Sequence, residues 1–544
     1  MDTQRLILFL VFSFSLLLLW DAWQKEIRPP AAPATQGAVP TPSGPAATPA
    51  AKGVEAMPPN AAPAGKPRER LRVRTDTLLA EIDTQGGDLV YLELLKHKDT
   101  HDEKKNFVLF GPEHRYSAQS GLIGAGLPNH RTLFRAAAKE FILEQDHDRL
   151  EVRLDADTAE GVKVAKVLTF HRASYRVDVA EEISNGTAAP IATHAYFQLT
   201  RDNKSPGGDP YMAQTYTGVA LYTEQDKFQK VTFEDIAKGK TPYPKTPDNG
   251  WIAIIQHYFV AALLPPDKMP REFYTRKLSE DLYSAGVIVP LGPVARGTSA
   301  RVVVPMYAGP QDQDQLQAVA PGLQLVVDYG WLTVIAAPLF WVLRLFHGWM
   351  GNWGLAIILL TVVIKLIFFP LSAASYRSMA KMKLVTPRLM KIREQYADDK
   401  TKMNQAMMDL YKSEEINPLG GCLPILVQIP VFIALYWVLF ESVELRHAPF
   451  YLWVRDLSAP DPWFVLPTLM MGSMIVQTKM NPTPPDPVQA KVMMIMPFAF
   501  GVMFYFFPSG LVLYWFVNNI LSILQQWQIT RMIEGTKPSA GAKR

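Results

Sequence analysis

The sequence contains one cysteine, Cys422, among its 544 residues. An intrachain disulfide is therefore impossible, and so is a metal site built from several cysteines. The chain also lacks a phosphate-binding Gly-x-x-x-x-Gly-Lys-Ser/Thr loop, a His-Glu-x-x-His zinc pair and a Gly-x-Ser-x-Gly nucleophile elbow. The formal net charge is only +4, which does not indicate nucleic-acid binding. We therefore expect no cofactor, no metal, no direct nucleic-acid substrate and no enzymatic activity.

What the chain does contain is unevenly distributed. Up to about residue 322 it has the charge and proline content of a soluble protein, whereas apolar side chains dominate the rest. A short apolar stretch, 6–20, follows Arg5 without a small-x-small cleavage site, so it predicts an uncleaved signal anchor. Residues 29–67 are rich in Ala, Pro, Gly and Thr and cannot bury a core, which predicts a flexible linker.

The segment from residue 70 to about 309 alternates strand-like runs with turn signals such as Gly86-Gly87 and Asn249-Gly250. Many strands with few helical periods predict a large antiparallel sandwich. The strand-like runs include 77–82, 150–154, 162–170, 175–183, 252–264 and 300–307.

Apolar segments in the second part of the chain predict membrane spans at 355–370, 423–443, 463–476, 492–507 and 511–525. Several are shorter than the usual ~20 residues, which suggests a thinned bilayer around them.

A further apolar stretch, 332–346, is ambiguous because Pro338 and Arg344 interrupt it. The segment 376–412 is rich in Lys and Arg and should be cytoplasmic. With the N-terminus inside and the sandwich outside, one crossing fits between the sandwich and this basic segment. We therefore predict that 332–346 is an amphipathic helix at the outer surface, that six spans cross the membrane and that both termini are cytoplasmic.

Lys365 lies inside the apolar run 355–369. A lysine near mid-membrane costs roughly 2.5–3.5 kcal/mol, but each Leu, Ile, Val or Phe returns about 0.3–0.6 kcal/mol, so the helix still inserts. The lysine either faces a polar interior or snorkels to the headgroups. Thr361 lies four residues earlier on the same helical face. Gln428 and Asn518-Asn519 in other spans either line a cavity or form hydrogen bonds with neighbouring helices.

The cytoplasmic segment 374–416 predicts a helical hairpin with its turn at Asp398-Asp399. Its methionines either accept varied apolar partners or pack between the two helices. Pro387 is expected to kink or interrupt the first helix.

Several motifs together resemble the YidC/Oxa/Alb family of membrane protein insertases. They are NPLGGCLP at 417–424, QIPVF at 428–432, VELR at 443–446, WVRDLS at 453–458, FPSGLVLY at 507–514 and, in the outer domain, NGWIAIIQHY at 249–258. The resemblance covers nearly the whole chain except the linker, and the large outer domain is similar to that of the Gram-negative form.

The resemblance implies a five-helix core around a hydrophilic groove that opens to the cytoplasm and to lipid. Lys365 matches a position where many members have arginine, so it keeps the charge but loses the planar fork. Thr361, Phe432 and Trp515 match positions that the family associates with substrate contact, and Trp515 stands where tyrosine is frequent. The expected groove residues are Lys365, Thr361, Gln428, Phe432, Asn518 and Trp515. The outer domain resembles a sugar-mutarotase supersandwich, without an assigned catalytic role.

These observations predict a membrane α-helical bundle, made of a signal anchor and a five-helix insertase core, with an all-β periplasmic supersandwich domain. The expected divisions are the anchor at 1–24, the linker at 25–69, the sandwich at 70–322, an interfacial helix at 323–350, the core at 351–530 with its hairpin at 374–416, and a basic tail at 531–544.

The expected function is insertion and chaperoning of inner-membrane proteins, alone or with the Sec translocon. Nascent membrane proteins, the ribosome and membrane lipids are the other expected partners. The alternative is a solute transporter or channel with a charged intramembrane site, but no inverted repeat is evident. An anchored carbohydrate enzyme is a third possibility, but it would not need the further spans.

Overall fold

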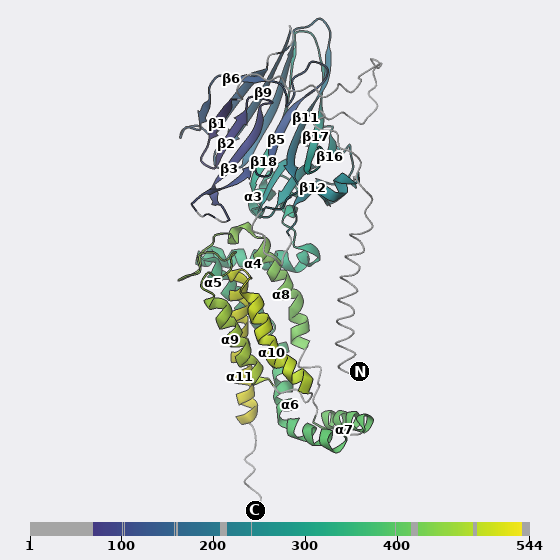
Figure 1. Cartoon of the computed structure of the whole chain (residues 1–544), viewed down its shortest axis with the longest axis vertical. Helices are drawn as coiled ribbons and strands as arrows, with labels where there is room; N and C mark the ends of the chain where they lie inside the picture. Colours follow the sequence, from purple (N-terminus) through teal and green to yellow (C-terminus); the bar gives the residue numbers. More distant parts are fainter. Residues whose placement is uncertain are drawn as a thin grey trace, which may run out of the picture.

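A computed structural model of the chain describes residues 69–535, apart from 101, 103, 157, 159–160, 207–214, 241, 398, 415–422 and 482–486. A β-sandwich occupies one end of the molecule and a bundle of helices the other (Figure 1). The predicted signal anchor, nearly all of the predicted linker, Cys422 and the last residues of the predicted tail lie outside the described residues.

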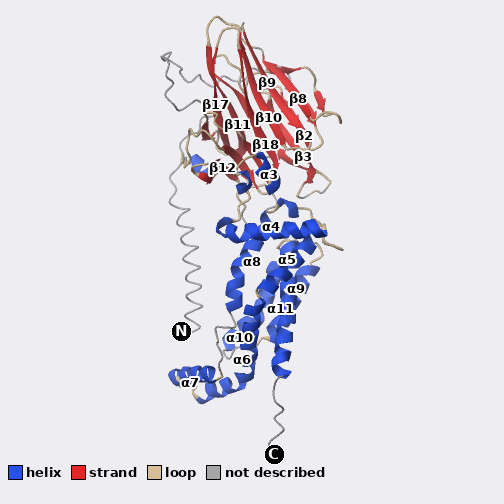
Figure 2. Ribbon diagram, turned by 180° about the vertical axis from the view of Figure 1, so that it is seen from behind, coloured by secondary structure: helices blue, strands red, loops and turns tan. Residues whose placement is uncertain are grey.

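The sandwich consists of two nine-stranded sheets (Figure 2). The first sheet has the order β16 (Glu272–Lys277), β17 (Leu282–Val294), β11 (Ile191–Asp202), β5 (Ser117–Ile123), β3 (Asp88–Lys98), β2 (Leu78–Asp83), β1 (Arg70–Arg74) and β7 (Glu140–Ile142), and β4 (Asn106–Phe110) also pairs with β3. The second has the order β13 (Lys227–Val231), β12 (Gly218–Thr223), β14 (Trp251–Gln256), β15 (Phe259–Leu263), β18 (Ser299–Pro310), β10 (Arg176–Asn185), β9 (Val162–His171), β8 (Arg149–Ala156) and β6 (Phe134–Ala136). The described strand pairs are antiparallel except β1 with β7, so the predicted sandwich is confirmed.

Alternating side chains build the core between the sheets. Along β1, Leu71 and Val73 face inward while their neighbours are exposed, as period-two alternation predicts. The predicted run 252–264 is wrong as a single strand, because the chain turns at His257-Tyr258 and forms the hairpin of β14 and β15. Tyr258 adopts φ 70°, a turn conformation that its residue type does not signal.

One group of charged side chains is buried inside the sandwich. The Lys166 ammonium donates to the carbonyl oxygens of Gly86 at 2.5 Å and Ser120 at 3.0 Å. Its Nζ also lies 3.6 Å from Glu181 Oε1 and 4.0 Å from Asp88 Oδ1. Burial raises the pKa of Asp88 to about 7, although the charge of Lys166 opposes the rise. The two sheets therefore share a buried lysine and two buried carboxyl groups.

The bundle and its hairpin are built from the helices that follow the sandwich. They are α5 (Trp353–Ile367), α6 (Phe369–Gln395), α7 (Lys400–Ser413), α8 (Leu423–Glu441), α9 (Val465–Met480), α10 (Pro487–Phe504) and α11 (Ser509–Gly535). α11 contacts α5, α6, α8 and α9, so it is the central helix of the bundle. Each predicted span falls on one of these helices, and α5 and α9 have only 15 and 16 residues.

Helix length and composition alone identify fewer candidate membrane spans than the sequence analysis predicts. Among the described helices, Gly330–Met350 is long and apolar enough to cross a membrane by itself. α5 and α6 meet the same test together, with a bend of 67° between them. Val427–Glu441 and Ala490–Phe504 are shorter apolar helices.

The short helices α2 (Phe233–Ala237), α3 (Gln313–Val319), η1 (Leu323–Val326) and η2 (Gly330–Leu332) surround the lower edge of the sandwich, and η3 (Val443–Leu445) follows α8. Between sandwich and bundle, α4 (Thr333–Met350) lies crosswise to the bundle helices and packs on α5 and α8 (Figures 1 and 2). Its inner face buries Ala336, Phe340 and Leu343 at helical spacing. That α4 lies at the membrane surface stays a prediction.

The predicted hairpin is formed by α6 and α7 at the end of the bundle away from the sandwich (Figure 1). Asp399 caps α7 by accepting a hydrogen bond from the backbone N–H of Lys402. Of the two effects expected of Pro387, the interruption is wrong, because α6 is continuous across this residue, whereas the kink stays a prediction. Val385 and Leu389 on either side are buried, and this packing offsets the lost backbone hydrogen bond.

The sandwich and the bundle are joined by specific contacts. The Arg446 guanidinium, just after η3, lies 5.3 Å from the ring centroids of both Phe107 in β4 and Phe259 in β15. Nearby, His257 Nε2 lies 3.1 Å from the carbonyl oxygen of Phe440 in α8. An arginine held over aromatic rings away from water is a favourable contact, so Arg446 links the two parts.

Candidate functional site

Four polar side chains from three helices meet inside the bundle. Lys365 Nζ of α5 donates to Ser522 Oγ of α11 at 2.7 Å, and Ser522 Oγ donates to the carbonyl oxygen of Asn518 at 2.8 Å. Gln428 Nε2 of α8 donates to Asn518 Oδ1 at 2.7 Å. We call these residues the polar cluster. They line up because Asn518 and Ser522 are four residues apart and share one face of α11.

Lys365 points into the bundle. Only 5% of the residue is exposed, so of its two predicted orientations the structure has the inward one. Its ammonium offers three donors, and Ser522 takes one of them. Neither α5, α9 nor α10 contains Asp or Glu, and no carboxylate among the described residues pairs with Lys365. The cluster therefore holds a cation without a counter-ion.

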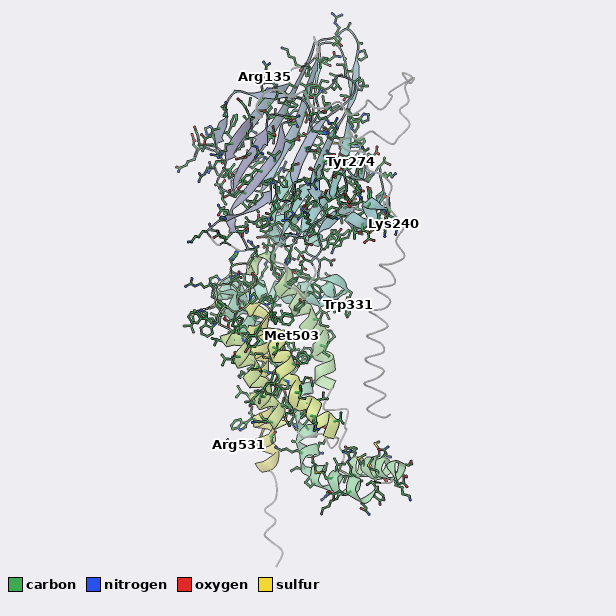
Figure 3. All side chains as sticks on the ribbon, viewed as in Figure 1. Arg135, Lys240, Tyr274, Trp331, Met503 and Arg531 are labelled. Carbon is green, nitrogen blue, oxygen red and sulfur yellow. The ribbon has the colours of Figure 1, made fainter. Side chains whose placement is uncertain are left out.

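α11 extends this polar contact toward α9. Asn519 Nδ2 donates to Ser473 Oγ at 3.1 Å, and Gln526 Nε2 donates to Asn481 Oδ1 at 3.0 Å. The helix continues to the far end of the bundle, where Figure 3 labels Arg531. α11 thus forms hydrogen bonds with α5, with α8, with α9 and with Asn481 just after α9.

Aromatic rings lie beside the polar cluster. Phe432 of α8 meets Trp515 of α11 edge to face, with ring centroids 4.4 Å apart at 86°, and Phe504 contacts Trp515 at 4.8 Å. Trp515 Nε1 is buried without a hydrogen-bond partner among the described residues. A buried donor without a partner is costly, and this one lies beside the polar cluster.

The predicted residues are thus not all in one contact network. Lys365, Gln428 and Asn518 are joined through hydrogen bonds, and Phe432 packs with Trp515. Thr361 is fully buried, but its hydroxyl donates to its own helix, to the Ile357 carbonyl oxygen at 2.7 Å.

Sequence reasoning overlooked Ser522 and also Ser473, the residue to which Asn519 donates its hydrogen bond. The i, i+4 spacing from Asn518 to Ser522 was the available signal.

The outer surface of the bundle is apolar, in contrast to the cluster inside. Exposed side chains of α10 include Val492, Met494, Ile495, Phe498 and Val502. In water this surface would be unfavourable, whereas lipid tails would cover it.

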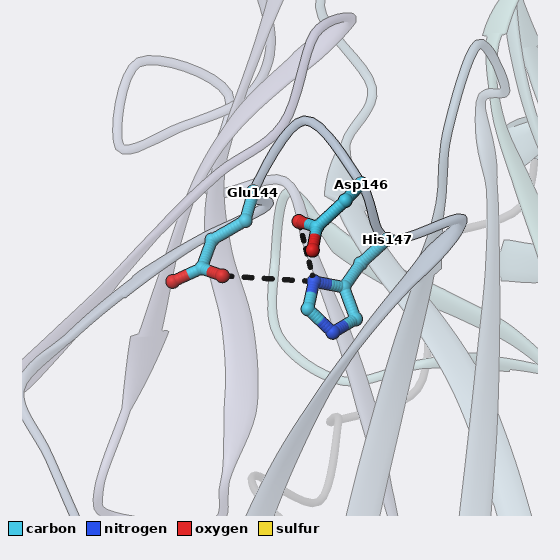
Figure 4. A group of neighbouring side chains, drawn as sticks. All are labelled: Glu144, Asp146 and His147. Carbon is cyan, nitrogen blue, oxygen red and sulfur yellow. Dashed lines mark ion pairs between the residues drawn. The ribbon is translucent and has the colours of Figure 1, made fainter.

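A small group of metal-binding side chain types lies far from the bundle. His147 Nδ1 lies 3.1 Å from Asp146 Oδ1 and 3.6 Å from Glu144 Oε2 on a loop of the sandwich (Figure 4). All three side chains are exposed, and acidic groups at an exposed loop are common without an ion. We attach no function to this group.

A bundle with an apolar surface, polar groups inside it and a β-sandwich at one end is typical of a membrane protein with a large domain outside the bilayer. Comparisons with known proteins identify its kind. Residues 70–342 match the family model of the YidC periplasmic domain, and residues 345–537 match that of the 60Kd inner membrane protein.

Full-length relatives agree. The chain is 56% identical to the membrane protein insertase YidC of Dechloromonas aromatica, over 100% of both chains. It is 58% identical to that of Aromatoleum aromaticum, over 99% of this chain and 100% of the other. A solved active YidC insertase covers 85% of this chain and 92% of its own, with 18% identity and a TM-score of 0.39. The chain belongs to the YidC family of membrane protein insertases, which supports the insertase prediction over the transporter alternative.

Proposed function

We propose that this chain inserts inner-membrane proteins by receiving the polar parts of a client at the polar cluster while apolar parts move into lipid. The observation that carries the proposal is Lys365, a cation held inside an apolar bundle by Ser522 and without a carboxylate partner among the described residues. A buried charge of this kind is costly, and such residues usually mark a functional path through the membrane.

The physical task fits this arrangement. Transfer of about 20 apolar residues into lipid is favourable by itself, so no nucleotide has to drive it. The obstacle is the polar flank, which must cross hydrocarbon. The cluster offers this flank hydrogen-bonding side chains and one positive charge, which lowers the barrier without changing the equilibrium. Acidic or strongly polar flanks should benefit most, since opposite charges attract more strongly at low dielectric.

We further propose a cytoplasmic hairpin, a periplasmic sandwich and cytoplasmic termini. The basic helices α6 and α7 lie at the opposite end of the bundle from the sandwich, which supports this orientation (Figure 1). Met390 and Met408 are exposed on the hairpin and would suit an apolar nascent chain, whereas Met382 and Met407 pack between its helices. Nascent membrane proteins, the Sec translocon, the ribosome and lipids are the proposed partners.

Reconstitution of the full chain into liposomes tests this function. A single-span client with an acidic translocated tail is added without nucleotide or Sec components, and its protection from protease is measured. We expect insertion well above empty liposomes, a clear loss with Lys365→Leu and retention with Lys365→Arg. Lys479→Leu, at an exposed lysine near the end of α9, is the matched control. Equal insertion by the Lys365→Leu and Lys365→Arg proteins would contradict the proposed role of the charge.

A further inference from the structure

A cavity of about 360 Å³ separates the sandwich from α4. Its volume falls within the range of about 300–1,000 Å³ that is usual for ligand pockets. The lining residues that matter here are Asp314 and Gln317 of α3, Gln324 of η1, and Phe340, Trp341 and Arg344 of α4. The cavity therefore lies between a polar wall from the sandwich and a largely aromatic wall from α4.

The polar groups of this cavity form a complementary pair of charges. Arg344 Nη1 lies 2.6 Å from Asp314 Oδ1, with 36% and 63% of the two side chains exposed. Both side chains remain partly exposed, so the Asp314 carboxylate can still accept hydrogen bonds from a ligand that carries N–H groups.

An apolar, exposed stripe of α4 includes Trp341, at the edge of the cavity. Val334, Trp341 and Trp349 are 84%, 63% and 68% exposed, and they follow one another at helical spacing. Trp331, just before α4, is 82% exposed and is labelled in Figure 3. Tryptophan is enriched at the boundary between lipid and water. A membrane surface along this stripe would bring lipid headgroups to the level of the cavity.

We propose that the cavity binds the phosphoethanolamine headgroup of an outer-leaflet phospholipid. The Arg344 guanidinium binds the phosphate, while the Asp314 carboxylate accepts hydrogen bonds from the ammonium. The acyl chains leave the cavity past Trp341 and lie along the exposed stripe of α4. The proposal rests on the proposed position of α4 at the outer membrane surface and is independent of the insertion step.

The donor and acceptor set explains why an amine headgroup fits better than the common alternatives. A choline headgroup has no N–H, so it could not donate a hydrogen bond to Asp314. A headgroup with phosphate alone would satisfy Arg344 but would place a second negative charge near Asp314. The charges of Arg344 and Asp314 add to zero, and a zwitterionic headgroup keeps the net charge of the cavity at zero. Charge-assisted hydrogen bonds from an ammonium are among the stronger ones in proteins.

Lipid competition on the full chain tests the headgroup. The protein in mixed micelles with equal phosphatidylethanolamine and phosphatidylcholine is analysed by native mass spectrometry, which counts the lipids retained. We expect about tenfold preference for the ethanolamine lipid, which corresponds to one favourable hydrogen bond to a charged group. Arg344→Gln and Asp314→Asn should each reduce this preference to near unity. The matched control is Arg115→Gln with Asp281→Asn, an exposed pair 2.5 Å apart in the sandwich.

Equal retention of the two lipids, or the same loss of preference in the control, would overturn the assignment. Competition by free glycerophosphoethanolamine at the lipid's own concentration would show a soluble ligand instead of a lipid. A separate arm compares quenching of the parent and Trp341→Phe proteins by brominated lipids. If Trp341 is not quenched, the position of α4 is wrong; if it is quenched without headgroup preference, the headgroup site is wrong. Neither result bears on insertion, which this experiment does not measure.

Discussion

Replacing Lys365 with leucine is expected to stabilise the bundle while it weakens insertion. The side chain is 95% buried, and its one hydrogen bond in the described structure goes to Ser522. In a fully dry site, exchanging lysine for leucine would gain about 3–4 kcal/mol on insertion scales. Ser522 and the polar groups of α11 already offset part of that cost. We therefore expect the free energy of unfolding to rise by about 1–3 kcal/mol.

Unfolding in lipid nanodiscs, followed by the fluorescence of the bundle tryptophans, measures this change. Ser522→Ala supplies a double-mutant cycle. It should lower the free energy of unfolding by about 1 kcal/mol in the parent protein, and by much less in the Lys365→Leu protein, where its partner is absent. Residues that a protein needs for activity often lower the stability of its fold. Destabilisation by Lys365→Leu would refute the reasoning, because the lysine would then hold the bundle together.

Three further changes test other parts of the structure. Asn518→Leu should cost about 1 kcal/mol of bundle stability, measured in the same nanodiscs, because it leaves the Gln428 amide unpaired; Gln428→Leu in the same protein should recover part of the loss. Arg446→Gln should weaken the contact between the sandwich and the bundle by about 1–2 kcal/mol. Hydrogen exchange should become faster in β4 and β15, while the rates in β8 and β9 stay unchanged. The raised pKa of Asp88 means that its stabilising contribution is complete below about pH 4 and is lost as the pH rises through about 7, on the order of 2–4 kcal/mol in total. Burial lowers the pKa of His130 to about 4, so His130 changes the stability with pH in the opposite direction. The test therefore compares urea unfolding of the Asp88→Asn and parent proteins at about pH 5 and about pH 8. If the stability of both proteins changes equally between these pH values, the proposed contribution of Asp88 is contradicted.

The sequence predicted the helices and strands of this molecule better than it predicted the contacts between them. The apolar run around Lys365 predicted a helix, because composition decides whether a segment buries in lipid. The direction of its side chain was undecided, because it depends on Ser522, 157 residues away. No local pattern reports such a contact. The turn at Tyr258 was overlooked for a similar reason, since its positive φ is imposed by the pairing of β14 with β15.

Pro387 shows that packing can outweigh a local preference against helix. A proline in a helix interior usually breaks it, yet α6 continues because neighbouring residues are anchored against α7. The resemblance marked Thr361, Phe432 and Trp515 as substrate-contact positions, and that role stays a prediction. It did not indicate that Phe432 packs against Trp515 or that the Thr361 hydroxyl bonds within its own helix.

The concentration of interhelical hydrogen bonds on α11 limits how this protein can change in length. Each residue turns an α-helix by about 100°, so one residue deleted before Asn518 would move its amide away from α8 and the Ser522 hydroxyl away from α5 together. A change of about one whole turn would restore the direction of these side chains but shift them by about 5 Å along the axis. Substitutions can therefore accumulate singly along α11, whereas insertions and deletions before Asn518 have to be compensated in α5, α8 and α9 at once.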